Sequence, residues 1–269
     1  MGTQLATWHM VEAPAAVPYR FGLFSQVTPR TSELSGTGVD DHWRLGVQWM
    51  SQSCGDAKLT TGPCIDAEVA PLLPDDYCSV SKYDPFTVYA YNNDDVPGFS
   101  MDEDLANAVA RLTNGEQEAA EEHVWDLATA AIGVGIVDLS AYPLWYGLGY
   151  VEQALAEAYG GQGVIHMNRL TATMLADQLR IEGGRLFTLL GTPVVAGGGY
   201  EKIGASAPTE GLIYGTGPLV MYRSDIDTRQ RAIDKATNQA SIIAQRDYVV
   251  GWDCVVVGAE VSLAIVEGS

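Results

Sequence analysis

The sequence predicts an α+β fold in which helices and strands interleave unevenly, within one large domain or two modest ones. Three features support this prediction. A long stretch with helical periodicity follows Ser100, the segments 241–250 and 252–266 are rich in β-branched residues, and no regular strand–helix alternation appears. Hydrophobic residues make up 47% of the 269 residues, which is typical of a chain that buries a real core.

The first hundred residues are predicted to be mostly irregular. Residues 1 to about 40 are rich in proline and turn formers and are expected to form an arm. Large side chains alternate with smaller or polar ones from Trp43 to Trp49, which predicts a half-buried strand. Phe86–Tyr91 predicts a second strand, and the turn-rich segment between the two predicts an extended loop that projects from the body.

The clearest local signal is a helix start at Ser100. Ser100 and Glu103 have the spacing of a capping box, and acidic residues favour the positive end of a helix dipole. Apolar residues recur at helical spacing until Asn114-Gly115, and the pattern resumes from Glu116 to about Ala131. This pattern indicates either one long kinked helix or two helices in series, at the surface in both cases.

The second half of the chain predicts a mixed core. Tyr150–Tyr159 is expected to be a helix that ends at Gly160-Gly161, and Asn168 is expected to cap a helix from Arg169 to about Leu179. Short apolar runs bounded by glycines predict strands. These strands are expected at 164–167, 185–190, 194–196, 212–214, 219–222, 241–250 and 252–266.

The composition argues against nucleic-acid-binding enzymes. Asp and Glu number 34 against 15 Lys and Arg, a formal net charge of −19, and no basic cluster stands out. Such a surface repels phosphates, which suits a container that must not adhere to packed DNA. The N-terminus lacks the pattern of a secretory signal. The apolar stretch 127–150 has the length of a membrane span, but Pro143, Asp138 and four glycines predict a buried core segment instead.

No catalytic, cofactor-binding or metal site is predicted. His123 in Glu121-Glu122-His123 lacks the second ligand of a zinc motif, so this run is expected to be a solvated helix face. His166 lies among apolar residues and is expected to be a core histidine with satisfied nitrogens. No local motif supports a cysteine–histidine nucleophile pair.

Glycine-rich and acidic segments also have simple structural interpretations. The clusters at 197–199 and 215–217 depart from the phosphate-binding patterns GxxxxGK and GxGxxG, so they are predicted to be turn glycines with positive φ. The run Asn92–Asp95 departs from the calcium-binding EF-hand spacing and is predicted to be a solvated loop before the helix.

Cysteines and aromatic residues leave alternatives open. The four cysteines form no CxxC pair, and they are either free thiols or include a disulfide between Cys54 and Cys64. Large aromatic rings gather in the arm and the loop, where they suit contacts between subunits or a second small core. The candidate contact residues are Trp8, Phe21, Phe24, Trp43 and Trp49.

The order of the predicted elements resembles a known family. The chain runs from an arm through a long two-stranded loop and a long helix to a mixed core and a terminal strand pair. This order, with the segments GQGVIHMNRLTATML, RLFTLLGTPVVAGGGY, GLIYGTGPLVMYRSDID and ASIIAQRDYVVGWDCVVVGAEVSL, is similar to the Hong Kong 97-type capsid fold. That fold is shared by major capsid proteins of tailed bacteriophages and by encapsulin shells. The segments resemble capsid proteins of phages that infect actinobacteria.

The resemblance implies a role for each part of the chain. These parts are an N-terminal arm at 1–33, an extended loop at 34–98, a spine helix with peripheral domain at 99–140, an axial domain at 141–210 and the closing strands of the peripheral domain at 211–269. The closing segments at 211–269 would pair with one another. Lys58 lies in the loop where some relatives form a covalent crosslink.

The implied function is structural and not enzymatic. The chain would self-assemble as hexamers and pentamers into the icosahedral head shell of a virion, built in the host cytoplasm. Its partners would be itself, scaffolding, portal and decoration proteins, and packaged DNA bound without sequence specificity, with no membrane and no cofactor. The alternatives are an encapsulin-like compartment shell and, in another class, a soluble hydrolase without a recognisable motif.

Overall fold

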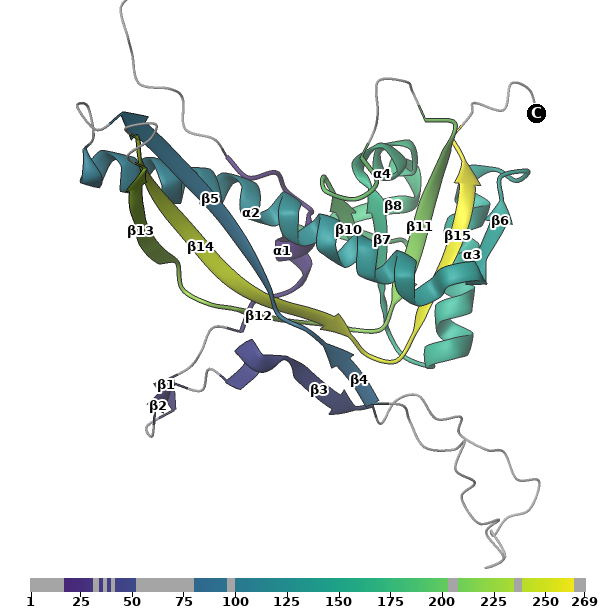
Figure 1. The fold of residues 1–269 in the computed structure, drawn as a ribbon. Helices are drawn as coiled ribbons and strands as arrows, with labels where there is room; N and C mark the ends of the chain where they lie inside the picture. The colour runs from purple at the N-terminus through teal and green to yellow at the C-terminus, as the bar shows by residue number, and fades with distance from the viewer. Residues whose placement is uncertain are drawn as a thin grey trace, which may run out of the picture.

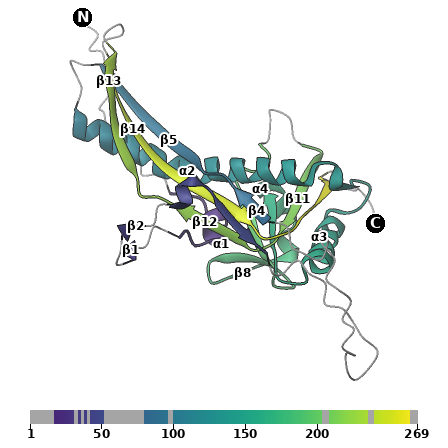
Figure 2. The same ribbon diagram turned by 60° about the horizontal axis from the view of Figure 1, so that its bottom comes forward.

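The computed structural model describes residues 17–30, 34–35, 38–39, 42–51, 80–95, 100–202, 208–234 and 239–263. Figure 1 shows the long helix α2 (Met101–Ile132) running along two separate β-sheets, one of four strands and one of seven. Figure 2 shows that the ends of β5, β13 and β14 form a tip at one end of the molecule, far from α3 at the other. This uneven mixture of helices and strands confirms the predicted α+β class.

The seven-stranded sheet has the order β6-β15-β11-β7-β10-β9-β8, and only β7–β10 and β6–β15 are parallel pairs. Its strands are β6 (Ile136–Leu139), β7 (Val164–Asn168), β8 (Leu179–Glu182), β9 (Arg185–Thr188), β10 (Pro193–Gly197), β11 (Glu210–Thr216) and β15 (Val256–Ser262). Helix α3 (Leu144–Tyr159) packs on β11 and β15, and α4 (Arg169–Met174) lies against β7 and β10. All five residues of the central strand β7 are buried.

The four-stranded sheet is built around β14 (Gln239–Trp252). The whole of β5 (Phe86–Asp95) pairs with one edge of β14, and β12 (Leu219–Arg223) and β13 (Asp227–Asp234) share the other edge. Strand β13 was not predicted. The loop predicted at Asn92–Asp95 is wrong, because these residues pair with the first residues of β14 and extend β5.

The segment before β5 carries shorter elements. These are α1 (Leu23–Gln26), β1 (Leu34–Ser35), β2 (Gly38–Val39), β3 (Val47–Met50) and β4 (Val80–Tyr83). Strands β3 and β4 pair, and β4 also contacts β14. The strand predicted from Trp43 is wrong in its first half: His42–Leu45 form a 3-10 turn, and Gly46, at φ +103°, separates that turn from β3.

Helix α2 is one continuous helix of 32 residues, which decides between the two predicted alternatives. Ser100 is its N-cap residue and accepts the backbone N–H of Asp104 at 2.9 Å, but the Ser100 side chain makes no capping hydrogen bond. The predicted capping box is therefore wrong in its side-chain bond. At Gly115 an added Cβ would meet nothing within 4 Å, so this glycine is not required by packing.

The later helices begin and end at identifiable residues. Helix α3 ends at Gly160, which adopts the left-handed conformation, as predicted. The Asn168 side chain caps α4 by accepting the N–H of Thr171 at 2.8 Å, also as predicted. The expected end near Leu179 is wrong, because α4 stops at Met174 and Leu179 pairs with Thr188 in the β8–β9 hairpin.

The closing segments of 211–269 pair with one another, but they do so in two different sheets: β11 with β15 in one, and β12 and β13 with β14 in the other. Strands β14 and β15 are consecutive but lie in different sheets, and so do β11 and β12. β11 pairs with both β15 and β7, so the predicted boundary at residue 210 cuts through the seven-stranded sheet.

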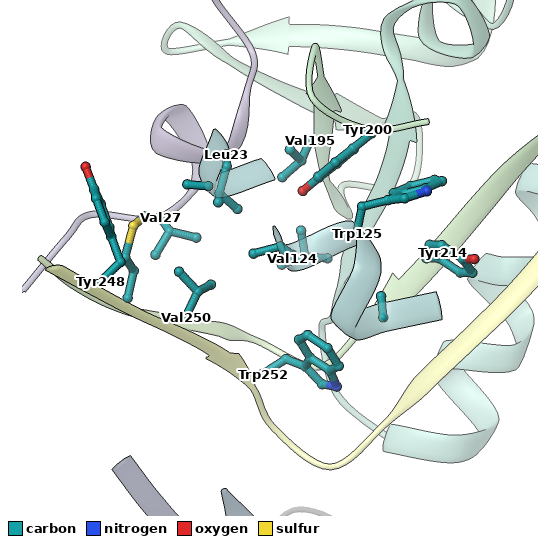
Figure 3. Packing of buried hydrophobic residues seen from close by; sticks show 14 residues of the cluster. Leu23, Val27, Val124, Trp125, Val195, Tyr200, Tyr214, Tyr248, Val250 and Trp252 are labelled. Atoms are coloured by element: carbon teal, nitrogen blue, oxygen red, sulfur yellow. The ribbon is translucent and has the colours of Figure 1, made fainter. Parts of the chain in front are cut away.

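The main hydrophobic core lies where α2 crosses the seven-stranded sheet (Figure 3). Trp125 of α2 is at its centre, with its ring 4.9 Å from that of Tyr200 and 4.6 Å from that of Tyr214. Trp252 of β14 and Leu23 of α1 belong to the same cluster, so this core joins both sheets. A second cluster under α3 covers the opposite face of the seven-stranded sheet.

The predicted positive φ of the glycine clusters at 197–199 and 215–217 is wrong, since none of these glycines is in the left-handed region. They are required by close approach instead. A Cβ at Gly199 would lie 2.1 Å from the Glu118 carbonyl oxygen, and one at Gly217 would lie 2.0 Å from that of Asp253. Positive φ occurs at the Gly183-Gly184 turn between β8 and β9.

Among the described helices, none combines the length and the hydropathy needed to cross a membrane.

A matched pair of glycine substitutions tests this packing argument. We expect Gly217→Ala to lower the free energy of unfolding by about 2 kcal/mol or more, because the backbone at Asp253 must move. Gly115→Ala should raise it by about 1 kcal/mol, because alanine favours the helix and meets nothing. Urea unfolding followed by circular dichroism measures both, and equal effects of the two substitutions would contradict the argument.

Candidate functional site

The segment 19–30, called the strap below, crosses α2 and joins the two sheets. At its start, the Ala196 N–H of β10 donates to the Phe21 carbonyl at 2.8 Å. At its end, the Arg30 N–H donates to the Met221 carbonyl of β12 at 2.8 Å. The strap therefore belongs to the body of this chain, although it falls within the predicted arm at 1–33.

Glu121 holds the middle of the strap. Its side chain is fully buried, and it accepts the Leu23 N–H at 2.8 Å and the Gly199 N–H at 2.9 Å. The Tyr19 hydroxyl also donates to this carboxylate. Burial raises the pKa of Glu121, against the opposing effect of these hydrogen bonds. The solvated face predicted for Glu121-Glu122-His123 is thus wrong at its first residue, because the strap and the glycine loop cover it.

The other two residues of that run have different surroundings. Glu122 is exposed and its carboxylate lies 2.8 Å from Lys202 Nζ. The ring of His123 packs 4.0 Å from that of Phe86, and burial lowers the His123 pKa. Within the described residues, no three metal-ligating side chains gather in one place.

His166 is the satisfied core histidine that was predicted. It is buried in β7, with Nδ1 2.9 Å from the Tyr200 hydroxyl and Nε2 2.9 Å from Thr216 Oγ1. Because the Thr216 hydroxyl donates its proton to the Gly217 carbonyl, His166 Nε2 is the donor to Thr216 and Nδ1 accepts from Tyr200. This arrangement requires the neutral ring, and burial lowers the His166 pKa to about 3.

A buried ion network ties α2 to the four-stranded sheet. Glu116 accepts two hydrogen bonds from Arg246 Nη1, at 2.7 and 3.0 Å, and one from the Tyr248 hydroxyl at 2.6 Å. Arg223 lies 3.7 Å from the same carboxylate. Burial, together with the adjacent Glu116, raises the pKa of Tyr248. Sequence patterns missed this network because Glu116 lies more than a hundred residues from each of its partners.

Three of the four predicted contact residues within the described ranges stack on a ring of their own chain. Phe24 stacks on Tyr248, Trp43 stacks on Tyr222, and Trp49 stacks on Tyr83. Phe21 lies 5.1 Å from the guanidinium of Arg20. Phe24 packs against the main core and Phe21 against the cluster under α3, and a role of the predicted residues between subunits stays a prediction. Trp8 lies outside the described residues.

The two tryptophans line a groove. Its volume is about 710 Å³, and it lies between the β3 segment and β12, with Trp43, Trp49 and Tyr222 in its walls. The Trp49 Nε1–H donates to Asp253 at 3.0 Å, which fixes one wall against the loop after β14. The strap also reaches this groove, because Arg30 lies in its lining.

An exposed apolar surface, which sequence reasoning missed, lies beside α3. We call it the α3 patch and define it as Tyr142, Trp145, Tyr146, Leu189 and Leu190. Its side chains are 42% to 83% exposed. A groove of about 380 Å³ runs between Trp145 and the two leucines. The rings of Tyr142 and Tyr146 stack with their centroids 4.7 Å apart. Their separation by four residues is the feature of the sequence that could have indicated this shared surface.

Cys254 is disulfide-bonded, so the expectation of four free thiols is wrong for this residue. The proposed partners Cys54 and Cys64, and the lysine at 58, lie outside the described residues.

The fold corresponds to that of solved shell proteins at low sequence identity. The capsid of the native GTA particle matches with a TM-score of 0.54 and 11% identity, covering 96% of this chain and 95% of that one. A protein of Mycobacterium phage Che8 matches at 0.53 and 9%, covering 96% and 97%. An encapsulin complex from Synechococcus elongatus matches at 0.51 and 11%, covering 71% and 79%.

These matches establish the fold. The chain has the Hong Kong 97-type capsid fold over nearly its full length, as the sequence predicted. No protein-family profile matches the sequence, and no curated protein shows significant similarity to it.

The neutral His166 predicts an acid-sensitive contribution to stability. Its folded pKa of about 3 lies below the ordinary 6.5, so its contribution is complete above pH 6.5 and decreases as the pH falls toward 3. Wild type should therefore lose about 2 kcal/mol more than His166→Gln between about pH 6.5 and about pH 5. Urea unfolding at the two pH values measures this, and equal losses in both proteins would contradict it.

Proposed function

We propose that this chain is the major capsid protein of a tailed bacteriophage, which self-assembles into an icosahedral head. The single observation that carries the proposal is that this chain and capsid chains match over nearly the whole length of both. The capsid of Ralstonia phage GP4, for example, matches at a TM-score of 0.52, covering 98% of this chain and 97% of that one, at 8% identity. The two chains thus correspond over nearly their whole lengths, and no large part is left over on either side.

The polar interior supports a structural role. The described buried charges and the core histidine bond to other parts of the same chain, as Glu116, Glu121 and His166 illustrate. Each of these bonds joins elements far apart in the sequence, which stiffens the subunit. A closed shell repeats such a rigid body while its peripheral contacts adjust to non-identical positions.

The proposed roles follow the predicted parts of the chain with three adjustments. The arm is the part of 1–33 that precedes the strap, since the strap is bonded to its own subunit. The extended loop of 34–98 ends before β5, which belongs to the four-stranded sheet. The spine helix with 99–140, the axial part around 141–210 and the peripheral closing part of 211–269 keep their proposed roles, with β11 and β15 reassigned to the axial sheet.

The proposed partners are other copies of the chain, as hexamers and pentamers, with portal, scaffolding and decoration proteins. The proposed location is the virion, after assembly in an actinobacterial host. This chain is similar to nearly the same degree to a protein of a Mycobacterium phage and to one of a Ralstonia phage. The proposed host therefore rests on the four sequence segments that resemble capsid proteins of actinobacterial phages.

The second candidate is an encapsulin-like compartment shell, which the match to the Synechococcus elongatus complex favours. That match covers 71% of this chain, against 96% or more for the capsid chains, so the phage head is the better account.

Purification of the overexpressed chain tests the proposal. We expect closed shells or capsomers in negative-stain micrographs and rapidly sedimenting species in the ultracentrifuge. A monodisperse monomer at high protein concentration would overturn the shell proposal. Co-purification of a cargo enzyme inside closed particles would favour the compartment instead.

A substitution in the α3 patch tests whether exposed apolar side chains join the copies. Leu190 is 83% exposed, so Leu190→Asp should leave the circular dichroism spectrum and thermal midpoint unchanged while it reduces assembly at least tenfold. Asn107→Asp adds the same charge at an exposed polar position of α2 and is the matched control. Equal assembly of the two variants would contradict a role for the patch.

A further inference from the structure

The strap meets α2 at the buried carboxylate of Glu121, at a hydrogen bond from Gln117 Nε2 to the Tyr19 carbonyl, and in the shared core. Two backbone N–H groups, from Leu23 in the strap and Gly199 after β10, converge on the two oxygens of Glu121. The Tyr19 hydroxyl of the strap donates to the same group. A Cβ at Gly22 would lie 2.4 Å from Glu121 Oε1, so the backbone approaches this carboxylate as closely as glycine permits.

The conformation of the strap is imposed by its contacts. Phe21 has a φ of +68°, which is unfavourable for a residue with a large side chain. The Ala196 N–H holds the Phe21 carbonyl, and the Gln26 side chain donates to the Leu186 and Val194 carbonyls at 2.8 and 2.9 Å. An isolated strap would relax at Phe21, so the strap stores strain that opening would release.

We propose that the strap, residues 19–30, opens as a unit, and that Glu121 is the latch that couples its opening to pH. The groups that face Glu121 are the Tyr19 hydroxyl from the strap, the Tyr200 hydroxyl from the glycine loop and the neutral Gln117 on its own helix. Arg169 of α4 lies 5.1 Å from the Tyr19 ring, and the exposed Glu118 contributes its backbone at Gly199.

The direction of the coupling follows from the burial of Glu121. In the closed strap the carboxyl has a raised pKa, while in the open strap it meets water and returns toward the ordinary 4.5. Opening therefore releases a proton, and the closed strap is most stable below the ordinary pKa. Between the two pKa values, opening becomes up to about tenfold more favourable for each pH unit gained.

An open strap would uncouple the two sheets. In the closed state one segment is bonded both to β10 of the seven-stranded sheet and to β12 of the four-stranded sheet. When it opens, Leu23 and Val27 leave the shared core, and α2 with the rest of that core connects the sheets. The proposal concerns the single chain, so it holds or fails separately from the proposed shell function.

Hydrogen exchange at backbone amides tests the latch in the full-length protein. The reporters are the Leu23, Ala196 and Gly199 amides, and the reference is the Ile165 amide in β7. After correction for intrinsic exchange, reporter protection should fall as the pH rises from about 4.5 to about 8, by up to about tenfold for each pH unit between the two pKa values of Glu121, while Ile165 protection stays constant. Reporter protection that does not change with pH, or that falls together with that of Ile165, would overturn the proposal.

Two variants separate the latch from its surroundings. Glu121→Gln cannot ionise and should abolish the pH dependence, whereas Glu122→Gln, at the exposed neighbour, should keep it. A pH dependence that persists in Glu121→Gln contradicts the assignment. If Glu121→Gln does not fold, Tyr19→Phe removes one donor to the charged carboxylate and should extend the fall in protection to higher pH. An unchanged profile in Tyr19→Phe also overturns the proposal.

Discussion

The other parts of the structure depend on one constraint, which is the burial of a row of α2 residues that turns slowly around the helix axis. Buried positions recur at every fourth residue from Asp104 to Ala128. Because an α-helix turns by about 100° per residue, each step of four advances the row by about 40° around the axis. The buried face at the start of α2 therefore points in a different direction from the face at its end. One helix can thus support the four-stranded sheet through Leu112 and the seven-stranded sheet through Val124.

Three buried carboxylates on this helix fix what packs against it. Asp104 accepts from Asn92 of β5, Glu116 from Arg246 of β14, and Glu121 from the strap and the glycine loop. A buried carboxylate is costly without partners, so each acid penalises any arrangement in which its own partners are displaced. The apolar positions between them supply most of the favourable free energy and are tolerant of small shifts. The acids thus specify the register that the apolar contacts leave open.

The sequence predicted those features that depend on near neighbours along the chain. The helical period located α2, and the Asn168 cap and the buried β7 strand were found from adjacent residues. Glu121 was misjudged because its local pattern is that of a solvated helix face, and the groups that cover it come from residues about 80 to 100 positions away. Gly199 was misjudged for the same reason, since its constraint is the Glu118 backbone of α2 and not its own φ.

Hydrogen-bonded polar groups and exposed apolar side chains lie in different parts of this chain, and they differ in how much movement they tolerate. Polar groups that need exact partners lie inside, along α2 and β7, where the same chain provides them. Apolar side chains without such requirements lie outside, as in the α3 patch. Apolar contact is non-directional and tolerates small rotations, whereas a buried hydrogen bond does not. A subunit that must keep one internal geometry in several surroundings therefore gains from having directional bonds in its interior and non-directional surfaces at its edges.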